Sequence, residues 1–246
     1  MPTLAQKPGL LAIPAYRETS RLPAFLAELL PALRDLPFPV VIQIVDDGSP
    51  PLETARLRAL LPIGDHGSCT VAPLLALTRN TQKGGAILAA WRAHRRAAWF
   101  AFVDADGAIP AAEVRRLIVT ALAAGASDRL WFAVRPLDTA RPLLRRLASR
   151  IFSTLAASVC SLPVADTQCG LKLISAPAWI AIEPNFLDSG FCFDVELLAR
   201  LHRARVSLVP FPLRWIERPG GHVHLWRAAP TMVLTLLRLR RRLPRL

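Results

Sequence analysis

The chain has 246 residues, with 31 Lys and Arg against 18 Asp and Glu, so its formal net charge at pH 7 is +13. Hydrophobic residues make up 52% of the sequence, which allows one large core and excludes a disordered basic chain. The excess positive charge indicates an anionic partner, which could be nucleic acid, a membrane surface or a phosphorylated substrate.

The first 140 residues alternate between short apolar runs and longer helical patterns. The runs that we interpret as buried strands are 10–14, 39–45, 71–77, 98–103 and 130–134. The stretches that we interpret as helices are 21–34, 52–61, 86–96 and about 109–124. Repeated units of this kind favour an α/β domain, a mostly parallel sheet with helices on both faces. In such folds ligands bind at the carboxyl ends of the strands.

Acidic residues follow three of these predicted strands. Glu18 comes after the first, Asp46 and Asp47 after the second, and Asp104 and Asp106 after the fourth. In an extended backbone residues i and i+2 point the same way, so Asp104 and Asp106 can face one cation. Mg²⁺ or Mn²⁺ held by one or two carboxylates keeps positions open for substrate phosphates. The alternative is a solvated acidic turn that caps a helix.

A Lys-Gly-Gly turn at 83–85 precedes the third predicted helix. Lys83 and free backbone N–H groups at a helix start could reach a phosphate. The sequence around it lacks the spacing of a P-loop, so it does not indicate an NTPase.

Beyond residue 140 the pattern changes. We expect an arginine-spaced helix that becomes apolar from 151, a loop at 166–170, a short strand at 171–174, a helix at 193–201 and a last strand at 206–215. The longest uncharged run has 15 residues, fewer than the roughly 20 that span a bilayer, so we expect no transmembrane segment. Four cysteines without patterned spacing favour reduced thiols in a cytoplasmic protein.

Several segments, taken in order, resemble glycosyltransferase family 2 enzymes of the GT-A fold, in the branch that glycosylates polyprenyl or dolichyl phosphate. The segments are IPAYRE (13–18), VDDGSP (45–50), KGGA (83–86), DADGA (104–108), DTQCGLKLI (166–174), FDVELL (193–198) and PLRWIE (212–217). The resemblance is strongest to dolichyl-phosphate β-glucosyltransferases. It implies a single GT-A domain and an inverting transfer of a hexose, glucose from UDP-glucose, to a polyprenyl phosphate.

The resemblance also implies roles for individual residues. The nucleotide pocket would be lined by Pro14, Tyr16, Glu18, Val45 and Asp47. Asp104 and Asp106 would hold the metal and diphosphate, with Mg²⁺ or Mn²⁺ as cofactor. Arg135 and either Arg146 or Arg150 match the positions that contact the acceptor phosphate. Arg218 falls where the family has a cation near the diphosphate.

The sequence departs from the family pattern at three places. Arg17 replaces the usual Asn of the first motif, and Ala108 stands where mannose synthases have a Gln metal ligand. The segment 218–223 lacks an expected Ser-Lys pair, which puts its diphosphate contact in question.

The acceptor determines which catalytic groups are needed. A phosphate monoester is largely a dianion at pH 7 and needs no general base, only positioning by cations such as arginine. A hydroxyl of a glycan or lipid would need a carboxylate base. Asp166, Asp194 and Glu196 are the candidates for that base. For Asp194 and Glu196 the alternative is a helix N-terminal turn that complements the dipole.

The C-terminal segment concentrates the charge. Residues 218–246 contain seven Arg and no acid, against 24 basic and 18 acidic residues (net +6) in residues 1–217. We therefore divide the chain into a catalytic domain (1–217) and a basic amphipathic tail (218–246). A stripe of Met232, Leu236, Leu239 and Leu243 would lie on an anionic membrane, so we expect peripheral attachment at its cytoplasmic face. The rival is a helix docked on the domain with a solvated basic face.

Two other classes of function remain open. Nucleic-acid binding rests on net charge alone, and no zinc spacing, aromatic pattern or helix-turn-helix supports it, so we expect no nucleic-acid partner. A non-catalytic scaffold derived from a transferase is the other. The sequence does not indicate an oligomeric state.

Overall fold

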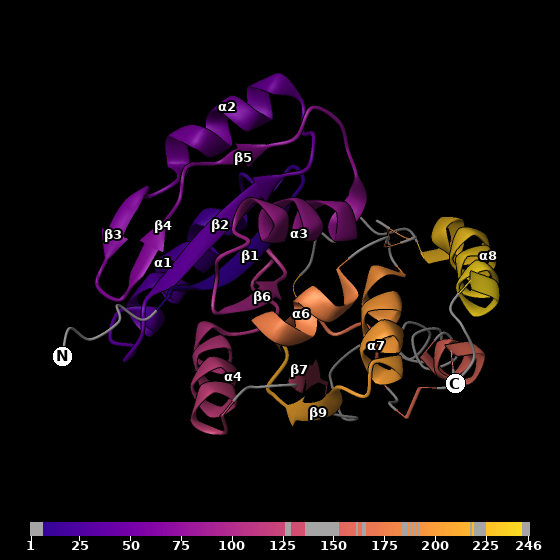
Figure 1. Cartoon of the computed structure of the whole chain (residues 1–246). Coiled ribbons are helices and arrows are strands. Elements are labelled where there is room, and N and C mark those ends of the chain that lie inside the picture. The colour runs from indigo at the N-terminus through magenta and orange to yellow at the C-terminus, as the bar shows by residue number, and fades with distance from the viewer. Residues whose placement is uncertain are drawn as a thin grey trace.

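A computed structural model describes residues 7–125, 129–135, 153–160, 162–163, 166–183, 186, 188, 190, 192–216, 218 and 225–242, with side chains in the last range from 234 onward. The described strands form a nine-stranded sheet with the order β3-β4-β2-β1-β6-β8-β7-β9, and β5 pairs with β2 (Figure 1). The strands are β1 (Gly9–Ala15), β2 (Val40–Asp46), β3 (Gly64–His66), β4 (Cys69–Val71), β5 (Leu75–Ala76), β6 (Trp99–Val103), β7 (Arg129–Val134), β8 (Leu171–Ser175) and β9 (Ser207–Pro212).

Most strand pairs are parallel, as predicted. The exceptions are β3, which is antiparallel to β4, and β8, which lies antiparallel between β6 and β7. The insertion of β8 brings the segment that follows residue 170 into the middle of the sheet. The predicted α/β class with a mostly parallel sheet is confirmed.

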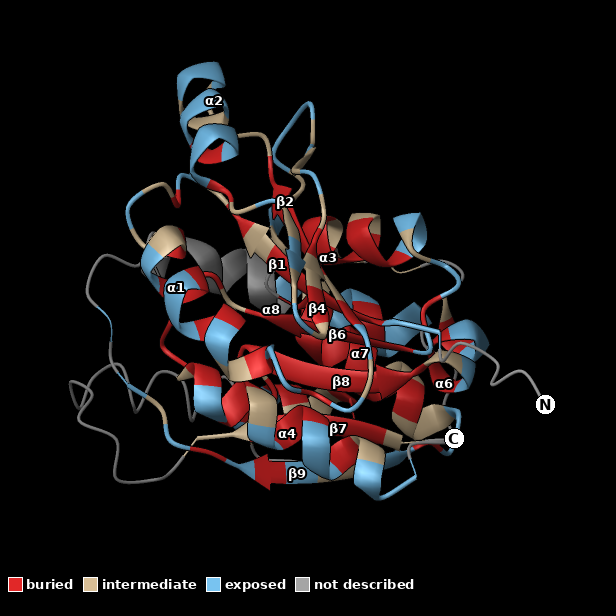
Figure 2. Ribbon diagram, turned by 90° about the vertical axis from the view of Figure 1, so that its left-hand side faces the viewer, coloured by how far each residue is buried: buried red, intermediate tan, exposed pale blue. Residues whose placement is uncertain are grey.

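Helices cover both faces of the sheet (Figure 2). They are α1 (Leu22–Leu33), α2 (Pro51–Leu60), α3 (Gln82–Ala93), α4 (Ala111–Ala123), α6 (Ala176–Ile182), α7 (Phe193–Arg203) and α8 (Leu225–Arg242). Side chains of α1 and α4 pack with one face of the sheet in one apolar cluster. Side chains of α3, α6, α7 and α8 form the cluster on the other face. The four cysteines lie among the described residues, where they are buried and no disulfide joins them.

Two predicted elements were wrong in detail, and two observed elements were not anticipated. The run 71–77 is not one strand, because β4 ends at Val71 and β5 begins at Leu75, with Pro73 between them. Proline has no N–H to give to a ladder. The Lys-Gly-Gly segment is not a turn before a helix but lies in the first turn of α3. Strand β3 and helix α6 were not anticipated.

The tail forms a helix that docks on the domain. Within α8, Leu236 and Leu239 are almost fully buried and belong to the cluster that contains α7. The predicted membrane stripe was therefore wrong for these two residues, since they face protein. Met232 and Leu243 lie outside the described side chains. Among the described helices, none combines the length and apolar character required to cross a membrane.

Candidate active site

The carboxyl ends of β2, β1 and β6 lie side by side and carry the acidic residues found in the sequence. Strand β1 ends at Ala15, β2 at Asp46 and β6 at Val103. The Asp47 N–H donates to the Ala15 carbonyl at 2.8 Å, which fixes the second acidic pair beside the first strand end. The predicted convergence on one sheet edge is confirmed.

Asp47 is held by the start of α3. Its Oδ1 accepts hydrogen bonds from the Thr81 N–H at 2.6 Å and the Thr81 hydroxyl at 2.7 Å. Burial raises the pKa of Asp47, and the bonds from Thr81 oppose that shift. Asp46 instead accepts from the Ser49 N–H and the Thr54 hydroxyl, so it shapes the turn.

The first motif forms the rim of this edge. Tyr16 is half-buried, and the Arg17 guanidinium lies 5.3 Å from the centre of its ring. Arg17 has a φ of 56°, a left-handed conformation that Asn and Gly adopt more easily than other residues. Glu18 is buried and forms an ion pair with Arg21, whose Nε donates to Glu18 Oε2 at 2.8 Å.

Asp104 begins a chain of alternating charges below the sheet edge. The Lys83 ammonium lies 2.9 Å from Asp104 Oδ1 and 3.3 Å from Asp194 Oδ2. The other oxygen of Asp194 accepts from the Lys172 ammonium at 2.6 Å. Lys83 therefore joins a strand-end carboxylate to a carboxylate of α7.

The electrostatics follow from this arrangement. Burial raises the pKa of Asp104 against the opposing charge of Lys83, and the carboxylates of Asp106 and Asp194 raise it further. Burial alone would raise the pKa of Asp194 and lower that of Lys83. The ion pairs reverse both effects, so the pKa of Asp194 is lowered and the pKa of Lys83 is raised.

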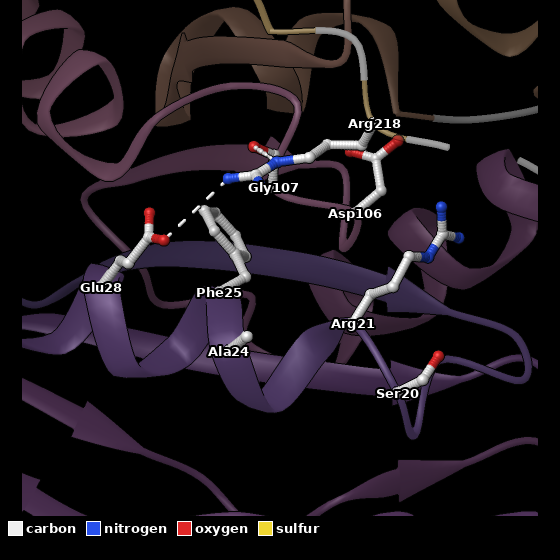
Figure 3. Close-up of a pocket in the computed structure, with 8 residues that line it drawn as sticks. All are labelled: Ser20, Arg21, Ala24, Phe25, Glu28, Asp106, Gly107 and Arg218. Atoms are coloured by element: carbon white, nitrogen blue, oxygen red, sulfur yellow. Dashed lines mark hydrogen bonds and ion pairs between the residues drawn. The ribbon is translucent and has the colours of Figure 1, made fainter. Parts of the chain in front are cut away.

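Asp106 lines a cavity of about 240 Å³ between the β6 loop and α1 (Figure 3). The cavity is also lined by Ser20, Arg21, Ala24, Phe25, Glu28, Gly107 and Arg218. The Arg218 Nε lies 3.4 Å from the Gly107 carbonyl, and its Nη2 lies 4.0 Å from Glu28. Arg21, at the N-terminal cap of α1, and Arg218, in the segment after β9, thus line the same cavity as the second carboxylate of the Asp-x-Asp pair.

Arg135, directly after β7, is held by a bidentate ion pair with Asp166. Its Nε and Nη2 donate to the two carboxylate oxygens at 2.9 Å and 2.7 Å, and its backbone N–H donates at 3.1 Å. Burial by itself would lower the pKa of Arg135. The hydrogen bonds and charge of Asp166, with a further contribution from Asp104, raise it instead. The site thus contains a fixed, permanently charged guanidinium within electrostatic range of Asp104.

The three carboxylates that could act as general bases are all in ion pairs. Asp166 pairs with Arg135, Asp194 with two lysines, and Glu196 Oε1 lies 2.7 Å from Arg200 Nε. Glu196 is fully buried, and its other oxygen accepts from the Asp188 N–H. The structure places Asp194 and Glu196 in the first turn of α7, where their charge also favours the helix.

The remaining predicted residues are placed as follows. Pro14 is half-buried in β1, next to Val45 in the register of the sheet. The Val45 side chain is fully buried in the core cluster beneath the edge. Arg146 and Arg150 lie outside the described residues.

Sequence reasoning missed four residues that organise the site. They are Thr81, Arg21, Gly170 and Lys172. Arg21 had a local signal, since it follows Glu18 by three residues, which is the spacing of a helical ion pair. Lys172 had a weaker signal, a single charge inside the apolar run LKLI.

The donor set fits a hard divalent cation. Asp104 and Asp106 offer carboxylate oxygens, the ligands that Mg²⁺ and Mn²⁺ prefer, and one or two carboxylates suffice when phosphates complete the shell. Burial is the main cause of the raised pKa of Asp104, and the nearby carboxylates of Asp106 and Asp194 add to it, so a bound cation would favour the ionised form of this carboxyl group. Within the described part of the chain, no group of three or more His, Cys, Asp or Glu side chains forms a larger metal cage.

Comparison with known proteins gives a consistent family. The family model described as glycosyl transferase family 2 matches residues 11–170. The dolichyl-phosphate β-glucosyltransferase of Saccharomyces cerevisiae is 27% identical over 230 residues, which cover 87% of this chain and 69% of the yeast protein. The polyprenol monophosphomannose synthase of Mycolicibacterium smegmatis is 29% identical over 217 residues, which cover 86% of this chain and 78% of that protein.

Solved structures share the fold. Glucosyl-3-phosphoglycerate synthase from Mycobacterium tuberculosis, crystallised with Mn²⁺, UDP-glucose and phosphoglyceric acid, superposes with a TM-score of 0.65. The match covers 96% of this chain and 80% of the other at 15% sequence identity. At that identity the likeness concerns the fold.

Proposed function

The chain belongs to glycosyl transferase family 2, and we propose that it moves a hexose from a nucleotide sugar to a polyprenyl phosphate at a membrane surface. The donor that we propose is UDP-glucose. The dolichyl-phosphate β-glucosyltransferases among its relatives support both the sugar and the lipid phosphate.

The proposal rests on one observation, which is that the three candidate general bases are all engaged in ion pairs. Asp166, Asp194 and Glu196 are all in ion pairs, and the pKa values of Asp166 and Asp194 are lowered. In Asp166 the hydrogen bonds and charge of Arg135 outweigh burial, which would raise the pKa. A carboxylate with a lowered pKa is a weak proton acceptor. The site therefore suits an acceptor that is already ionised, and a phosphate is one.

Arg135 is the residue that would bind this phosphate. Asp166 orients its guanidinium from one side, and a guanidinium fork matches phosphate oxygens bidentately. Arg150, or Arg146, is proposed as a second phosphate contact on the strength of the family resemblance alone. Arg135 stays charged at every physiological pH, so acceptor binding would not depend on its protonation.

The donor would bind over the edge formed by β2, β1 and β6. Pro14, Tyr16, Glu18 and Asp47 are proposed for the nucleoside, with Val45 contributing only through its backbone because its side chain is buried in the core. Lys83 and Arg218 are proposed for the diphosphate. Arg218 beside Gly107 supports this last role despite the missing Ser-Lys pair. Asp104 and Asp106 would hold a Mg²⁺ or Mn²⁺ ion, whose chemistry is to neutralise charge on the departing diphosphate.

The proposed reaction is a single displacement. An oxygen of the acceptor phosphate forms a bond to the anomeric carbon while the bond from that carbon to the nucleoside diphosphate breaks. The diphosphate leaves with the electron pair, and attack from the opposite face inverts the configuration to a β-linked polyprenyl phosphosugar. Arg135 positions the nucleophile, and Lys83 keeps Asp104 in place.

We propose that α8 supplies the contact with an anionic membrane, through the face opposite the predicted stripe. Leu236 and Leu239 are buried against the domain, whereas Leu234 and Leu237 are 56% and 45% exposed. Arg238 and Arg241 are also exposed. Leu237, Arg238 and Arg241 follow Leu234 by three, four and seven residues, so these four side chains share one face of the helix. Leucines among arginines on one outer face suit the boundary of an anionic bilayer.

A transfer assay tests the function. Purified protein is incubated with undecaprenyl phosphate in anionic vesicles, Mg²⁺ or Mn²⁺, and radiolabelled UDP-glucose, with GDP-mannose in parallel. We expect a labelled lipid whose mass is that of a polyprenyl phosphohexose. Arg135→Lys, which keeps the charge but loses the fork, should raise the KM for the lipid about tenfold or more. If neither UDP-glucose nor GDP-mannose gives a labelled lipid, the proposal is refuted.

A further inference from the structure

Lys172 is a fully buried cation in the middle of the sheet. It lies on β8 between Phe102 of β6 and Phe132 of β7, and its ammonium is 5.4 Å from the centre of the Phe102 ring. Taking an ammonium out of water is costly unless it is paired and hydrogen-bonded. Ile174, two residues further on and therefore on the same face of the strand, is fully buried in the apolar cluster, so this face accepts apolar side chains and the lysine needs a specific explanation.

All three donor positions of this ammonium have partners. Nζ lies 3.1 Å from the Thr167 carbonyl, 3.0 Å from the Cys169 carbonyl and 2.6 Å from Asp194 Oδ1. Two of these partners are backbone groups of the loop 166–170. Lys172 thus fixes the path of that loop in the protein interior, where no substrate reaches it.

The two ends of this loop hold the two halves of the site. Asp166, next to Thr167, orients Arg135 through its bidentate ion pair. The carbonyl of Gly170, next to Cys169, accepts a hydrogen bond from the backbone N–H of Asp104 at 3.0 Å. The third partner of Lys172, Asp194, reaches the same Asp104 through Lys83.

We propose that Lys172 is a positioning residue that fixes both Arg135, which would bind the lipid phosphate, and Asp104, which would hold the metal and diphosphate of the nucleotide sugar. A single buried cation would then couple the two substrate sites. The inference rests on the proposed function for the identity of the acceptor. It assigns Lys172 no contact with either substrate. Loss of its charge should therefore weaken binding at both sites together, whereas a change confined to Arg135 or Asp106 should affect one site.

The test compares Lys172→Met with Leu173→Ala, a matched control that truncates a buried side chain on the same strand. Affinity for Mn²⁺–UDP is measured by calorimetry without acceptor, and KM for undecaprenyl phosphate by the transfer assay. Thermal unfolding reports the stability of each variant. We expect Lys172→Met to lose about tenfold or more on both measures, the scale seen when partners behind metal ligands are removed. Leu173→Ala should lose stability and keep both affinities.

A second variant covers the case in which Lys172→Met does not fold. The double variant Lys172→Met, Asp194→Asn replaces the Lys172–Asp194 ion pair by neutral side chains of similar size. Neither partner of that ion pair is then left buried with an unpaired charge. The same joint loss is expected there. Normal affinities in a folded variant, or an equal joint loss in Leu173→Ala, would overturn the proposal. If the wild-type protein makes no lipid product, the acceptor assignment fails, and the Mn²⁺–UDP measurement still tests whether Lys172 positions the donor site.

Discussion

Gly170 accepts the backbone N–H of Asp104 at 3.0 Å and leaves no room for a side chain beside it. A Cβ on Gly170 would lie 1.8 Å from Asp104 Oδ2 and 2.3 Å from its Cγ. The close approach lets the loop that follows Asp166 touch the end of β6. This glycine is therefore a direct steric determinant of where the first carboxylate of the Asp-x-Asp pair stands.

Gly170→Ala should displace the Asp104 carboxylate. We expect the protein to fold and kcat/KM for the donor to fall about 100-fold, the cost of a misplacement of roughly 1 Å at a reacting centre. Steady-state kinetics with varied nucleotide sugar measures this. Gly64→Ala is the control, because a Cβ there meets open space while its φ of 122° still imposes strain far from the site. Unchanged kinetics in Gly170→Ala would contradict the steric role.

The Asp166–Arg135 pair should make stability depend on pH in the acid range. The pKa of Asp166 is lowered from its ordinary 3.8, because the hydrogen bonds and charge of Arg135 outweigh the opposing effect of burial. Its contribution to folding is complete above 3.8 and is lost as pH falls through the lowered value. The stability gap between wild type and Asp166→Asn should be constant from pH 7 to pH 5 and narrow below 3.8.

Urea unfolding from pH 7 to pH 3 measures this gap. Arg135 keeps its charge throughout the range, so only the carboxylate changes state. A gap that stayed constant down to pH 3, or widened, would show that the ion pair does not hold the pKa of Asp166 down.

Arg17 should be a site where a substitution stabilises the protein. Its φ of 56° is left-handed, and that region costs most L-residues about 1 kcal/mol or more, whereas Asn tolerates it. Arg17→Asn should therefore raise the free energy of unfolding by about 1 kcal/mol. Chemical denaturation measures it. Arg17→Ala removes the same guanidinium but keeps the strain, so an equal gain in that variant would argue against strain as the cause.

The outer face of α8 should determine membrane binding. Replacing Arg238 and Arg241 by Ala should weaken binding to anionic vesicles roughly thirtyfold, at about 1 kcal/mol for each arginine. Leu234→Glu should also weaken binding and leave the unfolding temperature unchanged, because this side chain is exposed. Vesicle sedimentation measures the partition. Leu239→Ala is the control for the inner face, and it should lower stability while the protein still binds.

The sheet edge could be predicted from sequence because its signals are local. Glu18, Asp47 and Asp104 each follow an apolar run, and parallel strands bring such positions to one edge. The charge chain behind them could not be predicted. Lys172 meets Asp194 only because β8 inserts antiparallel between β6 and β7, a pairing that no short-range pattern in the segment specifies.

The orientation of the last helix was also beyond the sequence. Apolar residues at helical spacing can be buried equally well by lipid or by protein. Leu236 and Leu239 face protein because they pack in the apolar cluster that contains residues of α7. The same limit applies to the split near Pro73, where a continuous apolar run concealed two short strands.

The most direct test of the central claim compares two acceptors that differ only in the phosphate. Undecaprenyl phosphate and undecaprenol are presented in identical anionic vesicles with Mn²⁺ and labelled UDP-glucose, and the labelled lipid is measured over time. If the acceptor is a phosphate bound by Arg135 without a general base, label should enter only the phosphorylated lipid. Transfer to the alcohol at a comparable rate would contradict this, because it would require a base that the ion pairs of Asp166, Asp194 and Glu196 do not provide.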